Sequence, residues 1–364
     1  MALGEPIAGI LPAQRIRAMI AIGTIMIERD VVAGQIQPAS LDLRLGTHAL
    51  RIRASFLSGP GTTVASKLDA LTLHRIDLTE GAVLETGCVY LVPLLESLAL
   101  PQGLAAITNP KSSTGRLDVF TRVIADGVGA FDQVPAGYHG PLYAEICPQT
   151  FPVIVRTGSR LSQIRFRQGT LADSDAETRI LQRDLKLVSG DGTDISGGIA
   201  LSVDLSGGGD GLVGYRAKRH TGLVDVDKPR SCLVTDYWEP VRAERSHRLV
   251  LDPDEFYILA SKESVHVPPT HAAEMVPFNP LVGEFRVHYA GFFDPGFGDA
   301  ATGGSGSRAV LEVRSHKVAF ILEDGQTIGR LVYERLTELP DQLYGAGIGS
   351  HYQAQGLKLS KHFY

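Results

Sequence analysis

Residues 90–101 read YLVPLLESLALP and residues 257–268 read YILASKESVHVP, so tyrosine, glutamate, serine and proline recur at matching places. The two stretches are 167 residues apart. Further pairs with that spacing are Ala105–Ala106 and Ala272–Ala273, Glu145 and Glu312, and 158–166 and 325–333. A shorter motif, Ser40–Leu43, returns as Ser202–Leu205 at a spacing of 162 residues. Several motifs at nearly constant spacing predict two copies of one domain of roughly 165 residues.

Both predicted copies are rich in short runs of branched and apolar residues that end at glycine. Val153–Arg156 and Lys317–Leu322 have the composition and partial alternation of β-strands. Gly158 and Asp324–Gly325 come directly after strand-like runs, so we expect hairpin turns there.

Helical signals are sparse in comparison. Pro12 precedes the amphipathic run Ala13–Ile22, which predicts a helix with proline at its start. A second short helix is expected at Asp252–Tyr257. The expected fold class is therefore all-β dominated with a few short helices, arranged as two tandem β-barrel or jelly-roll domains.

Length and charge limit the classes of protein to consider. The chain has 364 residues and a mass of 39.1 kDa, enough for two or three domains. With 35 Lys and Arg against 40 Asp and Glu, the net charge is −5, which argues against nucleic acid or anionic membranes as partners. No apolar run reaches the length of about 18 residues that a membrane-spanning helix needs.

The three cysteines, Cys88, Cys147 and Cys232, form no C-x-x-C pair. An odd number without such spacing argues against a disulfide framework, so a cytoplasmic location is expected. Zinc-dependent nucleoside deaminases carry H-x-E followed by P-C-x-x-C. The chain lacks this pattern, which excludes that class of enzyme.

The densest polar cluster lies at residues 109–116, which read NPKSSTGR. Lys111, Ser112, Ser113 and Arg116 could present ammonium, hydroxyl and guanidinium donors to phosphate oxygens. A plain surface turn is the alternative interpretation, because short clusters of this kind are common.

Glu145 and Glu312 each interrupt an otherwise apolar strand-like run. A carboxylate buried among aliphatic side chains has a raised pKa unless it is paired, and it could act as a general base or acid. Alternation along the strand could equally place both carboxylates in solvent. The residues alone leave this choice open.

Two further segments have the residue types of a ligand site. Residues 291–298, GFFDPGFG, combine proline and glycine in a tight turn, and an ordinary hairpin is the alternative. Residues 344–356, YGAGIGSHYQAQG, combine flexible glycines with aromatic and amide groups. Such a segment could close over a ligand, and a disordered terminus is the alternative.

These segments together resemble the dCTP deaminase family of the dUTPase-like superfamily. The resemblance rests on an ordered set of stretches: Ile36–Gly46, Tyr90–Pro101, Pro110–Arg116, Ala290–Gly298 and Ser350–Gly356. The family's Arg-Ser-Ser-x-x-Arg motif has Lys111 in place of its first arginine. The resemblance implies tandem dUTPase-like domains at 1–190 and 191–340 and a C-terminal lid at 341–364.

The two copies differ in what they retain. The N-terminal copy has Ser112, Ser113 and Arg116, whereas the other has Asn279, Pro280 and Gly283 near the matching place. Only the C-terminal copy has Asp294 in the hairpin. The resemblance therefore implies a composite site, with triphosphate contacts from one copy and the base pocket and lid from the other.

The implied reaction is hydrolytic deamination of dCTP to dUTP and ammonia, without protein-bound zinc, in the supply of dUMP and dTTP. Glu312 is favoured as the general base, with Glu145 as the alternative, and Ser112 and Arg116 support the reacting groups. The resemblance also implies a set of substrate-binding residues: Lys111, Ser113, Ala290, Asp294, Tyr344, Tyr352 and Gln355. Mg²⁺ would arrive with the nucleotide.

The expected partners are dCTP or dUTP and further copies of the chain in a homo-oligomer. A dUTPase, or an enzyme that both deaminates dCTP and hydrolyses dUTP, is the nearest alternative, because the Ala-Gly-x-x-Asp hairpin is shared by those enzymes. A nucleotide sensor without turnover is a further alternative, because fold alone does not fix function.

Overall fold

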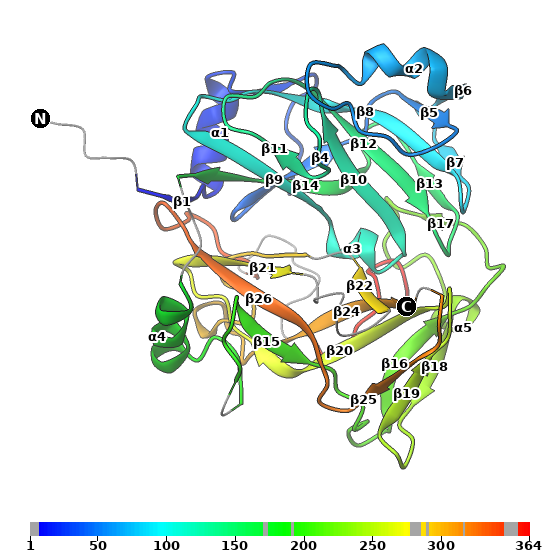
Figure 1. Cartoon of the computed structure of the whole chain (residues 1–364), viewed down its shortest axis with the longest axis vertical. Coiled ribbons are helices and arrows are strands. Elements are labelled where there is room, and N and C mark those ends of the chain that lie inside the picture. Colours follow the sequence, from blue (N-terminus) through cyan, green and yellow to red (C-terminus); the bar gives the residue numbers. More distant parts are fainter. Residues whose placement is uncertain are drawn as a thin grey trace, which may run out of the picture.

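The computed structural model describes residues 7–169, 174–190, 193–276, 285–288, 291–315, 317–345 and 356–364, with backbone only for 285–288. We call residues 7–169 the N-half, residues 174–345 the C-half and residues 356–364 the tail. Figure 1 shows the halves one above the other, with the C-terminus between them.

Two antiparallel sheets form most of the N-half. The first has the order β11 (Gln133–Val134), β9 (Leu104–Pro110), β14 (Arg160–Gln168), β4 (Ser40–Arg44) and β3 (Ile36–Gln37), with β1 (Gly9–Ile10) beside β14. The second has the order β10 (Val119–Ala125), β12 (His139–Pro148), β8 (Val89–Ala99), β5 (His48–Ile52) and β6 (Thr72–Asp77), with β2 (Ile25–Ile27) beside β8. Alternating apolar residues of both sheets, such as Leu41, Val92, Ile146 and Ile164, bury one core between them.

The C-half repeats this construction. One sheet has the order β15 (Ile199–Ser202), β26 (Thr327–Arg335), β21 (His271–Val276) and β23 (Phe292–Phe293). The other has the order β18 (Trp238–Arg242), β16 (Leu212–Ala217), β20 (Phe256–Val265), β24 (Ser307–Ser315) and β22 (Phe285–His288). A small ribbon pairs β19 (Arg248–Leu251) with β25 (Phe320–Glu323). The C-half has its own core, which includes Leu201, Leu259 and Leu311.

Short elements connect and cover the sheets. The helices are α1 (Ala13–Ala21), α2 (Ala65–Leu71), α3 (Ser112–Gly115), α4 (Asp175–Leu185), α5 (Val234–Tyr237) and the 3₁₀ helix η2 (Ala300–Thr302). A further sheet crosses between the halves, because β13 (Val153–Val155) pairs with both β7 (Ala82–Leu84) and β17 (Val224–Asp225). The halves are thus joined by backbone hydrogen bonds as well as by side chains.

Strand registers in the two halves agree at a spacing of 167 residues. Glu145 lies opposite Leu91 and Glu312 lies opposite Ile258. The other sheets give a second matched pair of partners: Phe166 with Ala106, and Tyr333 with Ala273. A duplicated domain would produce this agreement, and the duplication itself stays a prediction.

The strand-dominated fold class expected from the sequence is confirmed, and so is the first helix, which ends one residue early, at Ala21. The expected helix at Asp252–Tyr257 is wrong, because Phe256 and Tyr257 begin β20 and pair across to β24. The expected hairpins at Gly158 and Gly325 are also wrong. Both glycines adopt positive φ in turns, yet each turn joins strands of different sheets.

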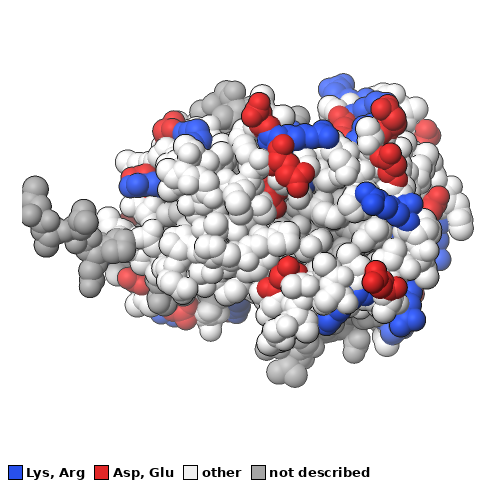
Figure 2. Space-filling view, turned by 90° about the horizontal axis from the view of Figure 1, so that it is seen from above, with Lys and Arg blue, Asp and Glu red and all other residues white. Residues whose placement is uncertain are grey.

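The surface charges and the state of the cysteines agree with the expectations from the net charge and the cysteine spacing. On the face shown in Figure 2, acidic and basic side chains are interspersed among a majority of other residues. Cys88, Cys147 and Cys232 are all free thiols. Within the described ranges, none of the helices combines the length and apolar character needed to cross a membrane.

Candidate active site

Alternation along β24 directs Glu312 toward the other half of the molecule. Leu311 and Val313 belong to the core of the C-half. Val310, on the same face as Glu312, packs in the core of the N-half, as does Ile258 opposite. Successive strand residues point to opposite faces, so Glu312 lies in the contact between the halves.

The motif at 110–116 meets Glu312 at this contact. β9 leads into the single turn α3, in which the Arg116 amide donates to the Ser112 carbonyl at 3.1 Å. The Arg116 Nε atom lies 3.7 Å from Glu312 Oε1, and both side chains are buried. Residues predicted from separate copies are therefore brought together, with Ser112 one helical turn from Arg116.

Burial dominates the electrostatics of Glu312. Desolvation raises its pKa to about 8, although the neighbouring Arg116 charge lowers it. A carboxyl group with this pKa exchanges a proton readily near neutral pH. Strongly shifted carboxyl groups beside one specific charge are typical of functional sites.

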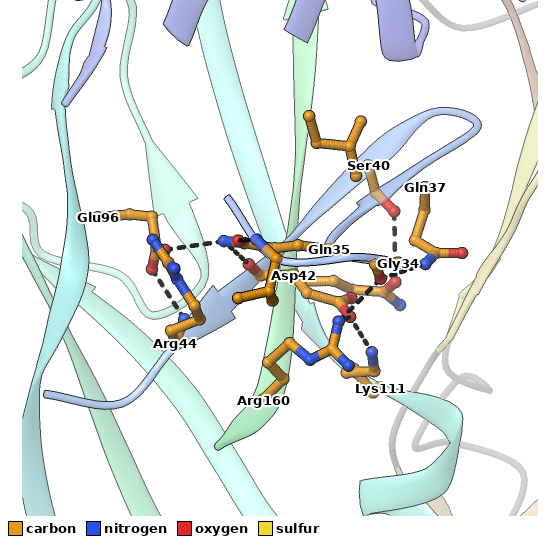
Figure 3. Close-up of polar contacts among 12 residues, drawn as sticks. Gly34, Gln35, Gln37, Ser40, Asp42, Arg44, Glu96, Lys111 and Arg160 are labelled. Atoms are coloured by element: carbon orange, nitrogen blue, oxygen red, sulfur yellow. Dashed lines mark hydrogen bonds and ion pairs between the residues drawn. The ribbon is translucent and has the colours of Figure 1, made fainter. Parts of the chain in front are cut away.

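Lys111 directly precedes α3 and is tied to the first sheet (Figure 3). Its Nζ atom donates to Asp42 Oδ2 on β4, and Arg160 lies 3.4 Å from the same oxygen. Arg44, two residues along β4, is fixed by Glu96 on β8 at 2.6 Å. Through these ion pairs, β4 supports the start of α3.

The tail reaches the same site from the end of the chain. Arg116 Nη1 donates to the Lys358 carbonyl at 3.0 Å, and Ser360 Oγ donates to the Ser113 carbonyl at 2.9 Å. Burial and the nearby charges of Lys111 and Arg160 lower the pKa of Lys361. The tail thus adds two lysines to a basic cluster around α3.

Asp294 lies in the turn after β23 and approaches from the C-half. This turn leads from β23 to β24, which belong to different sheets, so residues 291–298 form a turn and not a β-hairpin. Arg165 of β14 is fully buried, stacks 4.0 Å from the Phe292 ring centre and lies 3.3 Å from Asp294 Oδ1. Burial raises the pKa of Asp294, while the charges of Arg165 and Lys111 lower it. This turn therefore lies beside Lys111 of the α3 motif, and Arg165 supports it.

Tyr344 packs on the same turn. Its amide donates to the Pro295 carbonyl at 2.8 Å, and its ring centre lies 5.7 Å from that of Phe297. Three other residues predicted for substrate binding, Ala290, Tyr352 and Gln355, lie outside the described residues.

Glu145 is not brought to this site. Its strand β12 faces a separate apolar cluster that includes Tyr143, Leu91 and Ile124. Arg122 of β10 lies directly opposite and donates to Glu145 Oε1 at 2.6 Å. Glu145 is thus a buried carboxylate that is paired within its own half.

Sequence reasoning missed several residues of the site, including Arg165, Lys358 and Lys361. Arg165 lies between Ile164 and Phe166, but residues 160–168 read RLSQIRFRQ, so one more charge in this polar run gave no clear signal. The tail lysines had no signal either, because only the docking of the chain end brings them to α3. In the described parts of the chain, no three His, Cys, Asp or Glu residues are grouped as metal ligands.

Comparison with known families gives matches along both halves. Residues 7–170 match the family described as "2'-deoxycytidine 5'-triphosphate deaminase (DCD) N-terminal domain". Residues 174–363 match the family described as "2'-deoxycytidine 5'-triphosphate deaminase (DCD), C-terminal domain".

Individual proteins give the same result. The chain is similar to the crystal structure of a 2'-deoxycytidine 5'-triphosphate deaminase from Agrobacterium tumefaciens, with 61% identity and a TM-score of 0.87, over 90% of this chain and 99% of that one. It is 32% identical to a dCTP deaminase of Halorubrum lacusprofundi, over 41% of this chain and 72% of that protein. It is also 32% identical to a dUMP-forming dCTP deaminase of Methanoculleus marisnigri, over 36% of this chain and 67% of that protein.

Proposed function

The chain belongs to the dCTP deaminase family along both halves, and from this we propose that it hydrolyses dCTP to dUTP and ammonia. The observation that carries the proposed site is the buried contact between Arg116 of the N-half and Glu312 of the C-half. One residue comes from the polar cluster of the N-half and the other from a core strand of the C-half.

Glu312 is the general base in this proposal. Its carboxylate takes a proton from water and delivers it to N3 of cytosine, while the resulting hydroxide bonds to C4. Glu312 then passes the proton of the new hydroxyl to the 4-amino group, the C4–N bond breaks, and ammonia leaves. A pKa of about 8 suits a group that must both accept and return a proton.

Arg116 stabilises the ionised form of Glu312, because its positive charge opposes the cost of burying a carboxylate. Ser112, at the start of α3, orients water or the pyrimidine in this proposal. The basic residues around α3, among them Lys111, Arg160 and Lys361, suit the negative charge of a triphosphate. Mg²⁺ would enter with that triphosphate, and no protein-bound zinc takes part.

A second candidate is deamination followed by hydrolysis of dUTP to dUMP and pyrophosphate. The observation in its favour is the name of the Methanoculleus relative, which is dUMP-forming. Asp294 would be the residue to activate water in that second step. Against this role, Asp294 is buried against Arg165.

The deciding experiment uses chelator-treated protein with added Mg²⁺ and either dCTP or dUTP. Ammonia with dUTP as the product supports the proposal, whereas ammonia with dUMP and pyrophosphate supports the second candidate. Pyrophosphate from dUTP without ammonia from dCTP would identify a dUTPase and remove the role given to Glu312. Binding without either product would indicate a nucleotide sensor.

The cellular location and the oligomeric state of the protein are also proposals. Three free thiols fit a reducing cytoplasm. A homo-oligomer is proposed from the family resemblance, and light scattering of the purified chain tests it.

A further inference from the structure

A second ion pair crosses between the halves beside the pair formed by Arg116 and Glu312. Asp118 lies two residues after Arg116, and Arg314 lies two residues after Glu312. The Arg314 Nη2 atom donates to Asp118 Oδ2. Both links therefore join the same two segments, the end of α3 and the strand β24.

Each partner of this second pair is fixed in its own half. Thr150 Oγ1 donates to Asp118 Oδ2 and accepts from Arg314 Nη2 at 2.9 Å. Arg314 Nη1 donates to the Asp254 carbonyl in the turn before β20. Asp118 is almost fully buried at 1% exposure, so its carboxylate needs this compensation.

The distance between Arg116 and Glu312 is not fixed by a hydrogen bond between the two atoms that form the ion pair. Its 3.7 Å separation is longer than a charge-assisted hydrogen bond. The Asp118–Arg314 pair, by contrast, is hydrogen-bonded and shares Thr150. Alternate residues of a strand are roughly 6.6 Å apart on one face, so two links at that interval fix both the position and the rotation of β24 relative to α3.

From this geometry we propose that Asp118 and Arg314 are positioning residues that hold Glu312 at its working distance from Arg116. The inference rests on the proposed function, since it assigns Glu312 the role of base. Neither residue needs to touch the nucleotide. Removing Asp118 or Arg314 lets β24 shift against α3. That shift increases the distance between Glu312 and Arg116.

The test compares Asp118→Asn and Arg314→Gln with wild type for ammonia release from dCTP and for dCTP binding by calorimetry. A displacement of about 1 Å can cost roughly 100-fold in rate, so we expect kcat to fall about 10- to 100-fold. The Kd for dCTP should change less than about threefold. The double variant should be no slower than the slower single variant, because both remove one link.

Rescue and a matched control separate positioning from general stability. Arg314→Lys keeps the charge and should recover most of the lost kcat. Arg167→Met removes two other ion pairs between the halves, to Glu274 and to Glu334, each at 2.9 Å, and neither of them involves Glu312. It should lower the melting temperature about as much as Arg314→Gln but leave kcat near wild type.

The inference is overturned if Asp118→Asn and Arg314→Gln keep kcat within twofold of wild type while melting as early as Arg167→Met. It is also overturned if Kd rises in step with the loss of kcat. Should Asp118→Asn not fold, Thr150→Val weakens the same link more gently and must lower kcat by a smaller factor. Wild-type protein that releases no ammonia would reject the proposed function itself, a result distinct from all of these.

Discussion

Glu145 on β12 and Glu312 on β24 occupy matching register positions, opposite Leu91 and Ile258, yet their surroundings differ. Arg122 donates to Glu145 from the neighbouring strand at 2.6 Å. On the neighbouring strand β22, the residue opposite Glu312 is His288, where β10 has Arg122 opposite Glu145. Glu312 meets Arg116 only at 3.7 Å and from the other half.

The cover over each glutamate also differs. The face of β12 that bears Glu145 packs against residues around α2, including Phe56, Leu68 and Leu71. Figure 1 shows α2 at the outer end of the N-half, away from the C-half. The matching face of β24 is covered by the N-half, with α3 and the tail. The same position in the fold thus holds a structural ion pair in the N-half and a reactive carboxyl group in the C-half. The difference comes from the residues that cover each glutamate-bearing sheet face.

Replacing each glutamate by glutamine gives the largest expected contrast. Glu312→Gln should lower kcat for ammonia release about 10²- to 10⁴-fold, because amide cannot accept a proton from water. Glu145→Gln should keep kcat within about twofold, since Glu145 is paired away from the site. Assays of ammonia with calorimetric binding of dCTP check this. Equal losses in both variants would mean that two sites work, and the comparison would fail.

The pH dependence of catalysis gives the next effect in size. Because Glu312 must be ionised to act as base, kcat/KM should rise with pH and level off above about 8. Arg116→Met removes the charge that lowers this pKa, so the rise should move to higher pH. Glu145→Gln should show the wild-type profile. If the pH profile of kcat/KM instead changed in Glu145→Gln and stayed unchanged in Arg116→Met, the base would lie in the N-half.

Much of this site was predictable from residue types and spacing. The polar cluster with Ser112 and Arg116, and both buried glutamates, stand out in the sequence. The residue pattern alone could not show which glutamate is the base, because both strands have the same alternation of apolar residues around the glutamate. It depends on what covers each face, and long-range docking decides that. The bridge from Asp118 to Arg314, which are 196 residues apart, is hidden for the same reason.

One missed element did have a local signal. Helix α4 begins after Ser174, whose hydroxyl accepts from the Glu177 amide while the Glu177 side chain accepts from the Ser174 amide. This capping box is readable as Ser-x-x-Glu in the sequence. Helix α3 had no such signal, because it is a single turn whose position depends on the Lys111–Asp42 link and the tail.

Stability should respond to the two replacements in opposite directions. The folded-state pKa of Glu312, about 8, exceeds its ordinary value of 4.5, so the folded protein holds this proton more tightly. The associated stability is full below pH 4.5 and is lost as pH rises through about 8. Glu312→Gln avoids that loss and should be more stable than wild type at alkaline pH, by roughly 2–5 kcal/mol. Glu145→Gln should lose about 1–3 kcal/mol, because a partly buried Arg122 loses its partner.

Urea unfolding of these variants at about pH 6 and about pH 9 checks the prediction. The advantage of Glu312→Gln must grow between the two pH values, whereas the deficit of Glu145→Gln should change little. A Glu312→Gln protein that is destabilised at both pH values would show that the carboxylate contributes to folding, as Glu145 does. The stability contrast between the two glutamates would then be lost.

The smallest expected effect concerns the support that α3 receives from the tail. Ser360 Oγ donates to the Ser113 carbonyl and lies 2.9 Å from His362 Nδ1, while His362 Nε2 donates to the Val226 carbonyl. Burial lowers the pKa of His362 to about 4, so the ring stays neutral and this link is independent of pH near neutrality.

Ser360→Ala removes one buried hydrogen bond, which costs about 1 kcal/mol. Arg116 remains bonded to the Lys358 carbonyl, so kcat should fall by only a few fold, and urea unfolding with the ammonia assay measures both changes. A loss of kcat as large as that of Glu312→Gln would mean that the tail, more than the contact between the halves, orders the site.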